Sequence, residues 1–217
     1  MKFGITSVAG VVLAFLLSIC PAAFAAGPSA IELPKPRMDG GKPLMQALKD
    51  RMTIRTFAEE KLSMQNISDL LWAAFGISRP DGRRTAPSAR NRQETAIYLA
   101  TADGLFLWDA EKNVLNRISD KDIRAVTGMQ PYVKEAPLNL IYVADYSKLE
   151  KDPAGDKDLL VGADVGFISE NVYLYCASEG LATVVRALID KQALAKEMGL
   201  KPDQKIILAQ SVGFPKK

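Results

Sequence analysis

The segment from Leu159 to Glu179 constrains the fold more than any other part of this 217-residue chain. Apolar residues occupy nearly every face of the helix that this segment predicts, yet Asp164, Glu170 and Asn171 interrupt it. A helix that is apolar all round lies inside a protein or a membrane, and these polar residues favour the protein interior. We therefore expect a central buried helix that ends at Gly180, with other elements packed around it.

Helices come first along the chain. Pro43 to Arg51 is typical of a short helix. The segment LSMQNISDLLWAAFGIS, starting at Leu62, repeats apolar residues at helical spacing, with Ser63 as the expected N-cap and Gly76 as the stop. Residues 77–91 are rich in Pro, Gly and charge, which predicts a loop.

Strands follow, interleaved with helices. The run TAIYLATADGLFLWDA, from Thr95, predicts two strands joined by a tight hairpin at Asp103 and Gly104. A short helix is expected over residues 120–127, and LNLIYVADY predicts a buried strand. After the central helix, ATVVRAL predicts a strand, DKQALAKEMG a helix and KIILAQSVG a final strand. This order indicates an α+β fold, not the regular βαβ alternation of a Rossmann domain.

The first 25 residues have the pattern of a secretory signal peptide. Lys2 precedes an apolar run, and Ala23 and Ala25 supply the small-x-small end at which such leaders are cut. We expect cleavage after Ala25, a periplasmic or secreted product, an extended arm over residues 26–42 and one domain over residues 43–217. An uncleaved N-terminal anchor is the alternative.

The composition removes several classes of chemistry. The chain contains no histidine, which excludes Ser-His-Asp and Cys-His hydrolysis and most transition-metal sites. Loss of the leader would remove Cys20 and leave Cys176 alone, so no disulfide within the chain is expected. A net charge of +3 is too small to favour nucleic acid or a membrane surface. An enzyme of this composition is expected to take its chemistry from a cofactor.

The stretch RMTIRTF, starting at Arg51, is the first candidate binding motif. If this stretch is extended, the side chains of Arg51, Thr53 and Arg55 point the same way, because alternate residues share a side. Two fixed cations and a hydroxyl then converge on a patch that suits a phosphate and an electron-rich ring oxygen.

The stretch RRTAPSARNRQE, starting at Arg83, is the second. Its Pro- and Ser-bearing loop is expected to place Ser88, Asn91 and Gln93 close together. Amide side chains donate and accept hydrogen bonds at once, as the edge of a flat heterocycle requires.

At these residues the chain resembles the nitroreductase family of FMN-dependent oxidoreductases. The family pattern reads roughly Arg-Arg-Ser-x-Arg-x-Phe, followed later by Pro-Ser-x-x-Asn-x-Gln-Pro, and the resemblance continues through GADVGFISENVYLYCASEGLATVV and SVGFPKK. The stretch WAAFGISRPDGRRTAPSARNRQE is similar to the branch of the thiazoline/oxazoline dehydrogenases, although their Lys-Tyr pair is absent. The chain departs from the family pattern at Met52, Glu94 and Glu170, where Arg, Pro and Gln are usual.

The resemblance implies a mostly antiparallel sheet flanked by helices, and a homodimer with two FMN molecules at its interface. It assigns the FMN phosphate to Arg51 and Thr53, the pyrimidine edge at N1 and the C2 oxygen to Arg55, the phosphate or ribityl chain to Ser88, and the ring edge to Asn91.

Two further groups of residues are assigned by the resemblance. The turn of Leu181, Ala182 and Thr183 would cover one flavin face and offer a backbone N–H to N5, while their side chains pack in a strand. Lys216 and Lys217 would either reach the phosphate or form a disordered tail.

The implied function is electron transfer through FMN to a nitroaromatic, quinone or similar flat acceptor, with NAD(P)H as one candidate donor. No side chain is expected to act as a catalytic acid or base, and no metal is expected. Two alternatives stay open: an exported flavin-binding or electron-transfer module without turnover of its own, and a family member that binds no flavin. The joint presence of the motif residues disfavours the last.

Overall fold

The computed structural model describes Met1, residues 29–149 and residues 156–216, so the predicted signal peptide lies almost wholly outside the described residues. Within these ranges, one antiparallel sheet holds seven strands in the order β1-β4-β3-β2-β5-β7-β6. The strands are β1 (Ala30–Glu32), β2 (Thr95–Thr101), β3 (Gly104–Asp109), β4 (Val114–Ser119), β5 (Leu138–Asp145), β6 (Ala182–Arg186) and β7 (Gln204–Gly213).

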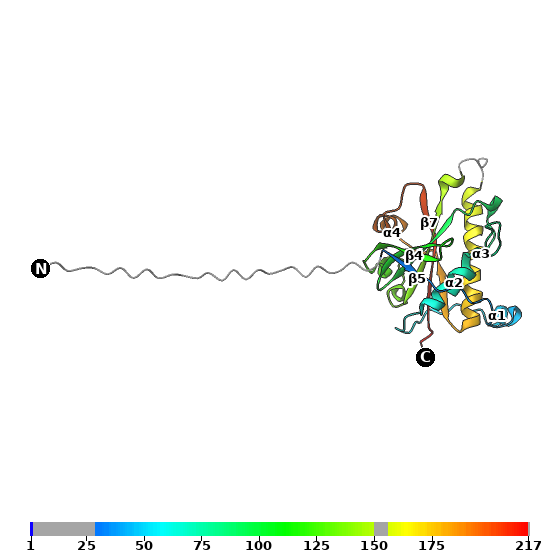
Figure 1. Cartoon of the computed structure of the whole chain (residues 1–217). Coiled ribbons are helices and arrows are strands. Elements are labelled where there is room, and N and C mark those ends of the chain that lie inside the picture. The colour runs from blue at the N-terminus through cyan, green and yellow to red at the C-terminus, as the bar shows by residue number, and fades with distance from the viewer. Residues whose placement is uncertain (2–28, 150–155, 217) are drawn as a thin grey trace.

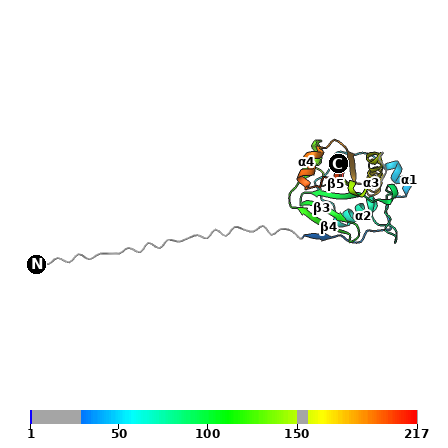
Figure 2. The ribbon, with the colours of Figure 1, turned by 90° about the horizontal axis from the view of Figure 1, so that it is seen from above.

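Helices cover both faces of the sheet (Figures 1 and 2). On one face lie α2 (Met64–Phe75) and α3 (Lys157–Glu179), with α1 (Leu44–Asp50) packed on α3, and on the other lies α4 (Lys191–Met198). Short 3-10 turns complete the described chain: η1 (Ala89–Asn91), η2 (Arg124–Val126), η3 (Pro131–Lys134) and η4 (Tyr146–Leu149). This is the α+β architecture that the sequence predicts.

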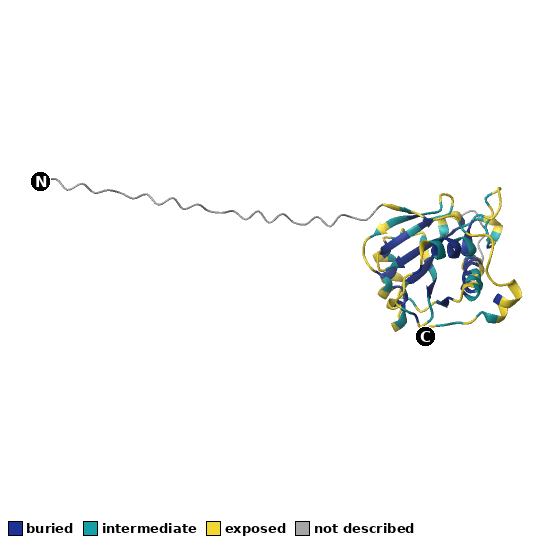
Figure 3. Cartoon of the chain, turned by 60° about the horizontal axis from the view of Figure 1, so that its bottom comes forward, coloured by how far each residue is buried: buried dark blue, intermediate teal, exposed yellow. Residues whose placement is uncertain are grey.

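The central strands are buried on both sides (Figure 3). In β2, Ile97 and Leu99 pack against the cluster beneath α2 and α3, while Tyr98 and Ala100 pack against the cluster beneath α4. Side chains alternate between the two faces of the sheet, as expected for a strand. Burial of the two apolar clusters holds the helices to the sheet.

The α2 helix starts and stops where its sequence predicts. The backbone N–H of Asn66 donates to Ser63 Oγ at 3.1 Å, and Asn66 Oδ1 accepts from the backbone N–H of Ser63 at 3.3 Å. This reciprocal cap stabilises a helix start by about 1 kcal/mol. The helix ends at Gly76, whose backbone is extended, and a Cβ at this position would overlap the side chain of Trp72.

The α3 helix is central but not buried all round, which corrects the prediction. It packs on α1, α2 and the strands β6 and β7, and Val165, Ile168 and Val172 are fully buried. Its outer side nevertheless leaves Leu159 and Phe167 exposed by 66% and 49%. None of the helices in the described part of the chain has the length and apolar content to cross a membrane.

One local prediction needs correction, and the structure adds detail to another. The helix expected over residues 120–127 is reduced to the turn η2, because Asp122 accepts hydrogen bonds from the backbone N–H and the Nε of Arg124 and ties the chain locally. The expected linker of residues 26–42 contains β1, which pairs with β4 at the sheet edge, and Arg37 forms an ion pair with Asp69 of α2 at 2.7 Å. The part of this arm that is described is extended but anchored.

Candidate functional site

The RMTIRTF stretch is extended and runs along the outer edge of the sheet. The N–H of Ile54 donates to the carbonyl of Thr183 in β6 at 3.0 Å, and Phe57 forms a bridge with Pro215. Because β6 is the last strand of the sheet, this stretch covers backbone groups that the edge would otherwise expose.

Tyr173 of α3 organises the start of this stretch. Its hydroxyl accepts a hydrogen bond from the N–H of Val185 at 3.0 Å and lies 3.0 Å from the hydroxyl of Thr53. The guanidinium carbon of Arg51 lies 5.4 Å from the centroid of the Tyr173 ring, within cation–π range. Arg51 and Thr53 therefore point toward the same side chain, as their spacing predicts. Neither Tyr173 nor Val185 was a candidate from the sequence alone.

Arg55 and Lys216 lie at the outer end of the same stretch. The side chains of both residues are exposed and have no hydrogen bond or ion pair with the residues that the structure describes. The backbone N–H of Lys216 donates to the carbonyl of Thr56 at 3.4 Å, which keeps the C-terminal strand extension beside the stretch. Lys217 lies outside the described residues. The structure thus brings Arg51, Thr53, Arg55 and Lys216 to one edge of the molecule.

The turn of Leu181, Ala182 and Thr183 adjoins this edge, but its side chains are buried, as expected for strand packing. The hydroxyl of Thr183 donates to the carbonyl of Ser211 at 2.9 Å inside the sheet. The N–H of Leu181 donates to the carbonyl of Cys176 at 2.8 Å and closes the end of α3. Within this chain, the Leu181 N–H is therefore already engaged and does not offer a free donor.

The second stretch forms a compact loop around Gln93. Ser88 Oγ accepts from the Gln93 N–H at 2.9 Å, and Asn91 Oδ1 accepts from Gln93 Nε2 at 3.0 Å. The backbone takes positive φ angles of 53° at Asn91 and 47° at Gln93, a region that Asn tolerates better than most residues. Ser88, Asn91 and Gln93 are close together, as the sequence predicts.

A buried carboxyl pair fixes this loop to α3. The N–H of Ala89 donates to Asp164 Oδ2 at 2.8 Å, and Glu94 is only 2% exposed. Burial raises the pKa of the Glu94 carboxyl, and the nearby charge of Asp164 raises it further. Burial also raises the pKa of Asp164, while the hydrogen bond from Ala89 opposes that rise. The two carboxyl groups beside the loop, Glu94 and Asp164, therefore both have raised pKa values.

The two predicted halves of the site contact different parts of α3. The first half meets Tyr173 and the second meets Asp164. These residues are nine positions apart, so their backbones are about 13 Å apart along the helix axis. A single chain does not bring Arg55 and Asn91 together as one compact set.

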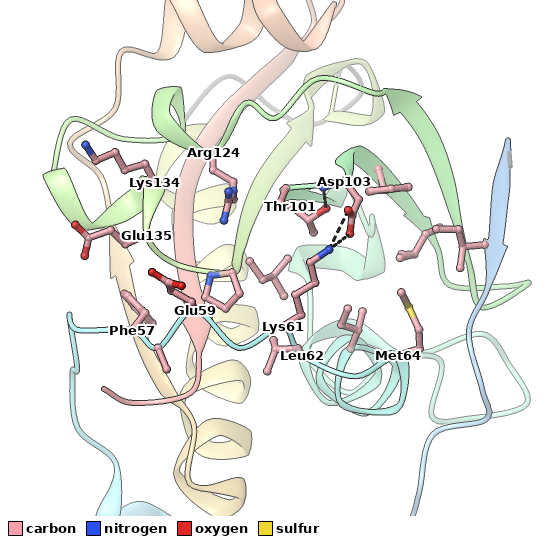
Figure 4. A pocket seen from close by; sticks show the side chains of 18 of the residues that line it. Phe57, Glu59, Lys61, Leu62, Met64, Thr101, Asp103, Arg124, Lys134 and Glu135 are labelled. Carbon is pink, nitrogen blue, oxygen red and sulfur yellow. Dashed lines mark hydrogen bonds and ion pairs between the residues drawn. The ribbon is translucent and has the colours of Figure 1, made fainter. Parts of the chain in front are cut away.

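A cavity of about 1040 Å³ adjoins the outer end of this edge, because Phe57 and Lys216 help to line it (Figure 4). It opens between the start of α2, the β2–β3 turn and residues 134–138, and its apolar floor includes Phe106 and Leu115. Two cations at its mouth already have partners, because Lys61 pairs with Asp103 at 2.9 Å and Arg124 pairs with Asp122 at 2.7 Å. Lys134 and Lys216 also line this cavity, so it holds further cations besides these two.

In the described part of the chain, no three His, Cys, Asp or Glu side chains are placed to hold a metal ion. Cys176 is fully buried, and burial raises the pKa of its thiol far above the ordinary value. The thiol therefore packs as a small apolar group.

Comparison with known proteins agrees with this fold. Residues 48–214 match the family model described as the nitroreductase family. The chain belongs to the nitroreductase family, a family of FMN-dependent oxidoreductases.

Three individual relatives of this chain are also named as nitroreductases. A curated protein of Methanocaldococcus jannaschii named as a nitroreductase is 29% identical over 161 residues, which cover 69% of this chain and 81% of the relative. A crystal structure from Ralstonia eutropha, also named as a nitroreductase, superposes with a TM-score of 0.84 at 37% identity, covering 88% of this chain and 91% of the other. A protein from Desulfovibrio desulfuricans, solved in complex with FMN, shares the fold with a TM-score of 0.59 at 21% identity, over 81% and 88% of the two chains.

Proposed function

We propose that this chain binds FMN along the edge formed by the RMTIRTF stretch and passes electrons through it to a nitroaromatic, quinone or similar flat acceptor. FMN would supply the redox chemistry, and the protein would supply position and charge. The observation that carries this proposal is that Arg51 and Thr53 meet at Tyr173, on the extended stretch beside β6 that also carries the exposed Arg55.

The residues present fit the cofactor. Arg51 and Thr53 offer a guanidinium and a hydroxyl for the phosphate, held by the buried Tyr173. The unpaired guanidinium of Arg55 can form charge-assisted hydrogen bonds with the pyrimidine edge. A fixed cation there favours the reduced, anionic ring over the neutral one.

We further propose that the site is shared between two copies of the chain. A second copy would bring its Ser88 and Asn91 to the first copy's Arg55, which one chain does not do. An exposed apolar surface on α1 and α3 supports this assembly, and it includes Leu44, Met45, Leu48, Leu159, Leu160 and Phe167. Gly162 and Gly166 face open space on the same helix and would let a partner helix approach closely.

The spectrum of the purified protein tests the cofactor. A flavin absorption spectrum supports the proposal, and anaerobic bleaching by NADH or NADPH supports turnover. A bound flavin that neither donor reduces would favour the electron-transfer module instead. Absence of flavin after incubation with excess FMN would contradict the proposal.

Arg55 is the side chain that tests the assigned geometry. Arg55→Ala should weaken FMN binding by about one to two decades, the cost of a lost charge-assisted hydrogen bond, with the apoprotein equally stable. Arg55→Lys keeps the charge but not the planar guanidinium, so its FMN affinity should lie between that of the parent and that of Arg55→Ala. Equal FMN affinity in all three proteins would remove Arg55 from the site.

Export is a separate proposal. The signal-peptide pattern supports a periplasmic or secreted product that begins at Ala26. The intact mass of the exported protein tests it, and a mass that includes Met1 would contradict cleavage. In that compartment nicotinamide donors are scarce.

A further inference from the structure

The cavity of about 1040 Å³ runs across the sheet, and the flavin proposal leaves most of it unassigned. Five strands that are neighbours in the sheet each contribute to its lining: Ile31 of β1, Leu115 of β4, Phe106 of β3, Thr101 of β2 and Leu138 of β5. Neighbouring strands lie about 4.8 Å apart, so the four spacings from β1 to β5 give a length of about 19 Å across the strands. The cavity is therefore elongated.

The floor of this cavity belongs to the hydrophobic core. Phe106, Leu115 and Leu138 are each at most 3% exposed, so their neighbours hold them in place. The facing wall comes from α2, where Ile67 is buried and Met64 is 45% exposed at the mouth. Protein interiors contain few voids larger than a water molecule, so a space of this size is not an ordinary packing defect. Its volume is that of a ligand pocket.

The polar groups of the lining gather at one end. Lys134 and Glu135 precede β5, and Figure 4 shows them on one side of the ion pair between Lys61 and Asp103. Met64 lies on the other side of this ion pair, toward the apolar residues that β1 and β4 contribute. The cavity thus has a polar end beside β5 and an apolar end beside β1.

The charges around the cavity balance. Lys61 donates to both carboxylate oxygens of Asp103, at 3.0 and 2.9 Å, and Arg124 pairs with Asp122 at 2.7 Å. The remaining charged groups of the lining are two cations and two acids, namely Lys134, Lys216, Glu59 and Glu135. A charged ligand would meet like and opposite charges in equal number, whereas a neutral polar group can form hydrogen bonds with either kind.

We propose that this cavity binds a neutral molecule with a polar head and a long apolar chain. The head would lie beside Lys134 and Glu135, and the chain would lie along Phe106 and Leu115 toward β1. A single aromatic ring spans less than two strand spacings and would leave much of the apolar floor uncovered. The apolar surface that we assign to assembly, on α1 and α3, shares no residue with the described lining of the cavity. This binding requires no flavin.

Titration calorimetry with straight-chain alcohols tests the class of ligand. Octanol, decanol and dodecanol would be added to the purified protein below the concentrations at which they aggregate. Affinity should rise roughly tenfold for each two methylene groups added, with a negative change in heat capacity on binding. Decanoate and decylammonium have a comparable chain but a charged head. They should bind several-fold more weakly than decanol, because their charge loses hydration and finds no uncompensated partner.

A pair of matched variants tests the location. Met64→Glu places a carboxylate at the apolar end of the cavity and should weaken decanol binding tenfold or more. An acidic residue suits this position at the start of α2, so the fold should be retained. Met129→Glu changes another exposed methionine, which does not line the cavity, and should bind decanol like the parent.

Each contrary outcome overturns a stated part of the proposal. Affinity that does not depend on chain length, or decanoate that binds as tightly as decanol, contradicts the class of ligand. Equal binding by the parent and Met64→Glu contradicts the location. If the parent is a dimer that Met64→Glu dissociates, the cavity is an interface between copies and the proposal fails. A parent that binds no alcohol also contradicts it, whether or not that parent binds FMN, so this failure is distinct from failure of the proposed function.

Discussion

The hydroxyl of Tyr173 and the backbone N–H of Val185 form a 3.0 Å hydrogen bond that ties the central helix α3 to the edge strand β6. The same hydroxyl lies 3.0 Å from that of Thr53, so one side chain aligns the helix, the edge strand and the candidate phosphate-binding stretch. The position of the RMTIRTF stretch therefore depends on a residue far from it in the sequence.

Replacement of this hydroxyl should have two measurable effects. Tyr173→Phe leaves the Val185 N–H without its acceptor, so urea denaturation of the apoprotein should show a loss of about 1–2 kcal/mol in unfolding free energy. FMN affinity should also fall, because Thr53 loses its support. Tyr175→Phe is a matched control on the same helix, since its hydroxyl makes only one long hydrogen bond of 3.4 Å, to the carbonyl of Asn66. Equal behaviour of the two variants would contradict the role given to Tyr173.

The buried Glu94 predicts an unusual dependence of stability on pH. Its pKa is raised in the folded protein, so the native state holds this proton to higher pH than the unfolded chain does. Its contribution is therefore most favourable at low pH and is lost as pH rises from the unfolded pKa through the folded pKa.

Gln at position 94 cannot ionise, so the Glu94→Gln variant should not lose this contribution to stability as pH rises. Its amide can also donate a hydrogen bond where Glu94 Oε2 has no partner among the residues that the structure describes. We expect it to be more stable than the parent by about 1 kcal/mol at neutral pH, with the difference shrinking in acid. Thermal melts across the pH range measure this. The exposed Glu60→Gln serves as the control, and a variant that is less stable at neutral pH would refute the prediction.

The exposed apolar side of α3 predicts assembly. Phe167→Glu places a charge on this surface, so it should convert a dimer to monomers in sedimentation analysis with an unchanged circular dichroism spectrum. FMN retention should fall with the dimer. Ile118→Glu changes a comparably exposed apolar residue on β4 and should leave the oligomeric state as it was. A parent that is monomeric and still retains FMN would exclude the shared site.

The sequence predicted those elements whose signals are local. The cap at Ser63, the turn at Gly104 and the alternation of β2 side chains between the two sheet faces all depend on neighbours in the chain. The strands β1 and β4 escaped prediction, because Ala30–Glu32 is short and its partner is far along the chain. The loop around Gln93 was recognised, since its polar residues are adjacent in sequence.

The long-range parts of the site could not be predicted in this way. Tyr173 and Val185 meet Thr53 only after α3 and β6 pack together, and nothing in their own neighbourhoods marks them.

The shared flavin site is the central claim, and a heterodimer tests it most directly. One chain would carry Arg55→Ala and the other Asn91→Ala, with different affinity tags, so that only mixed dimers are purified. FMN would be supplied at a concentration that fills the parent but neither variant homodimer. If Arg55 and Asn91 of different chains meet at each flavin, one site carries both lesions and the other carries neither, so about one FMN per heterodimer should bind. If both residues of a site come from the same chain, each site carries one lesion. The heterodimer would then bind no more FMN than the variant homodimers, which would contradict the account.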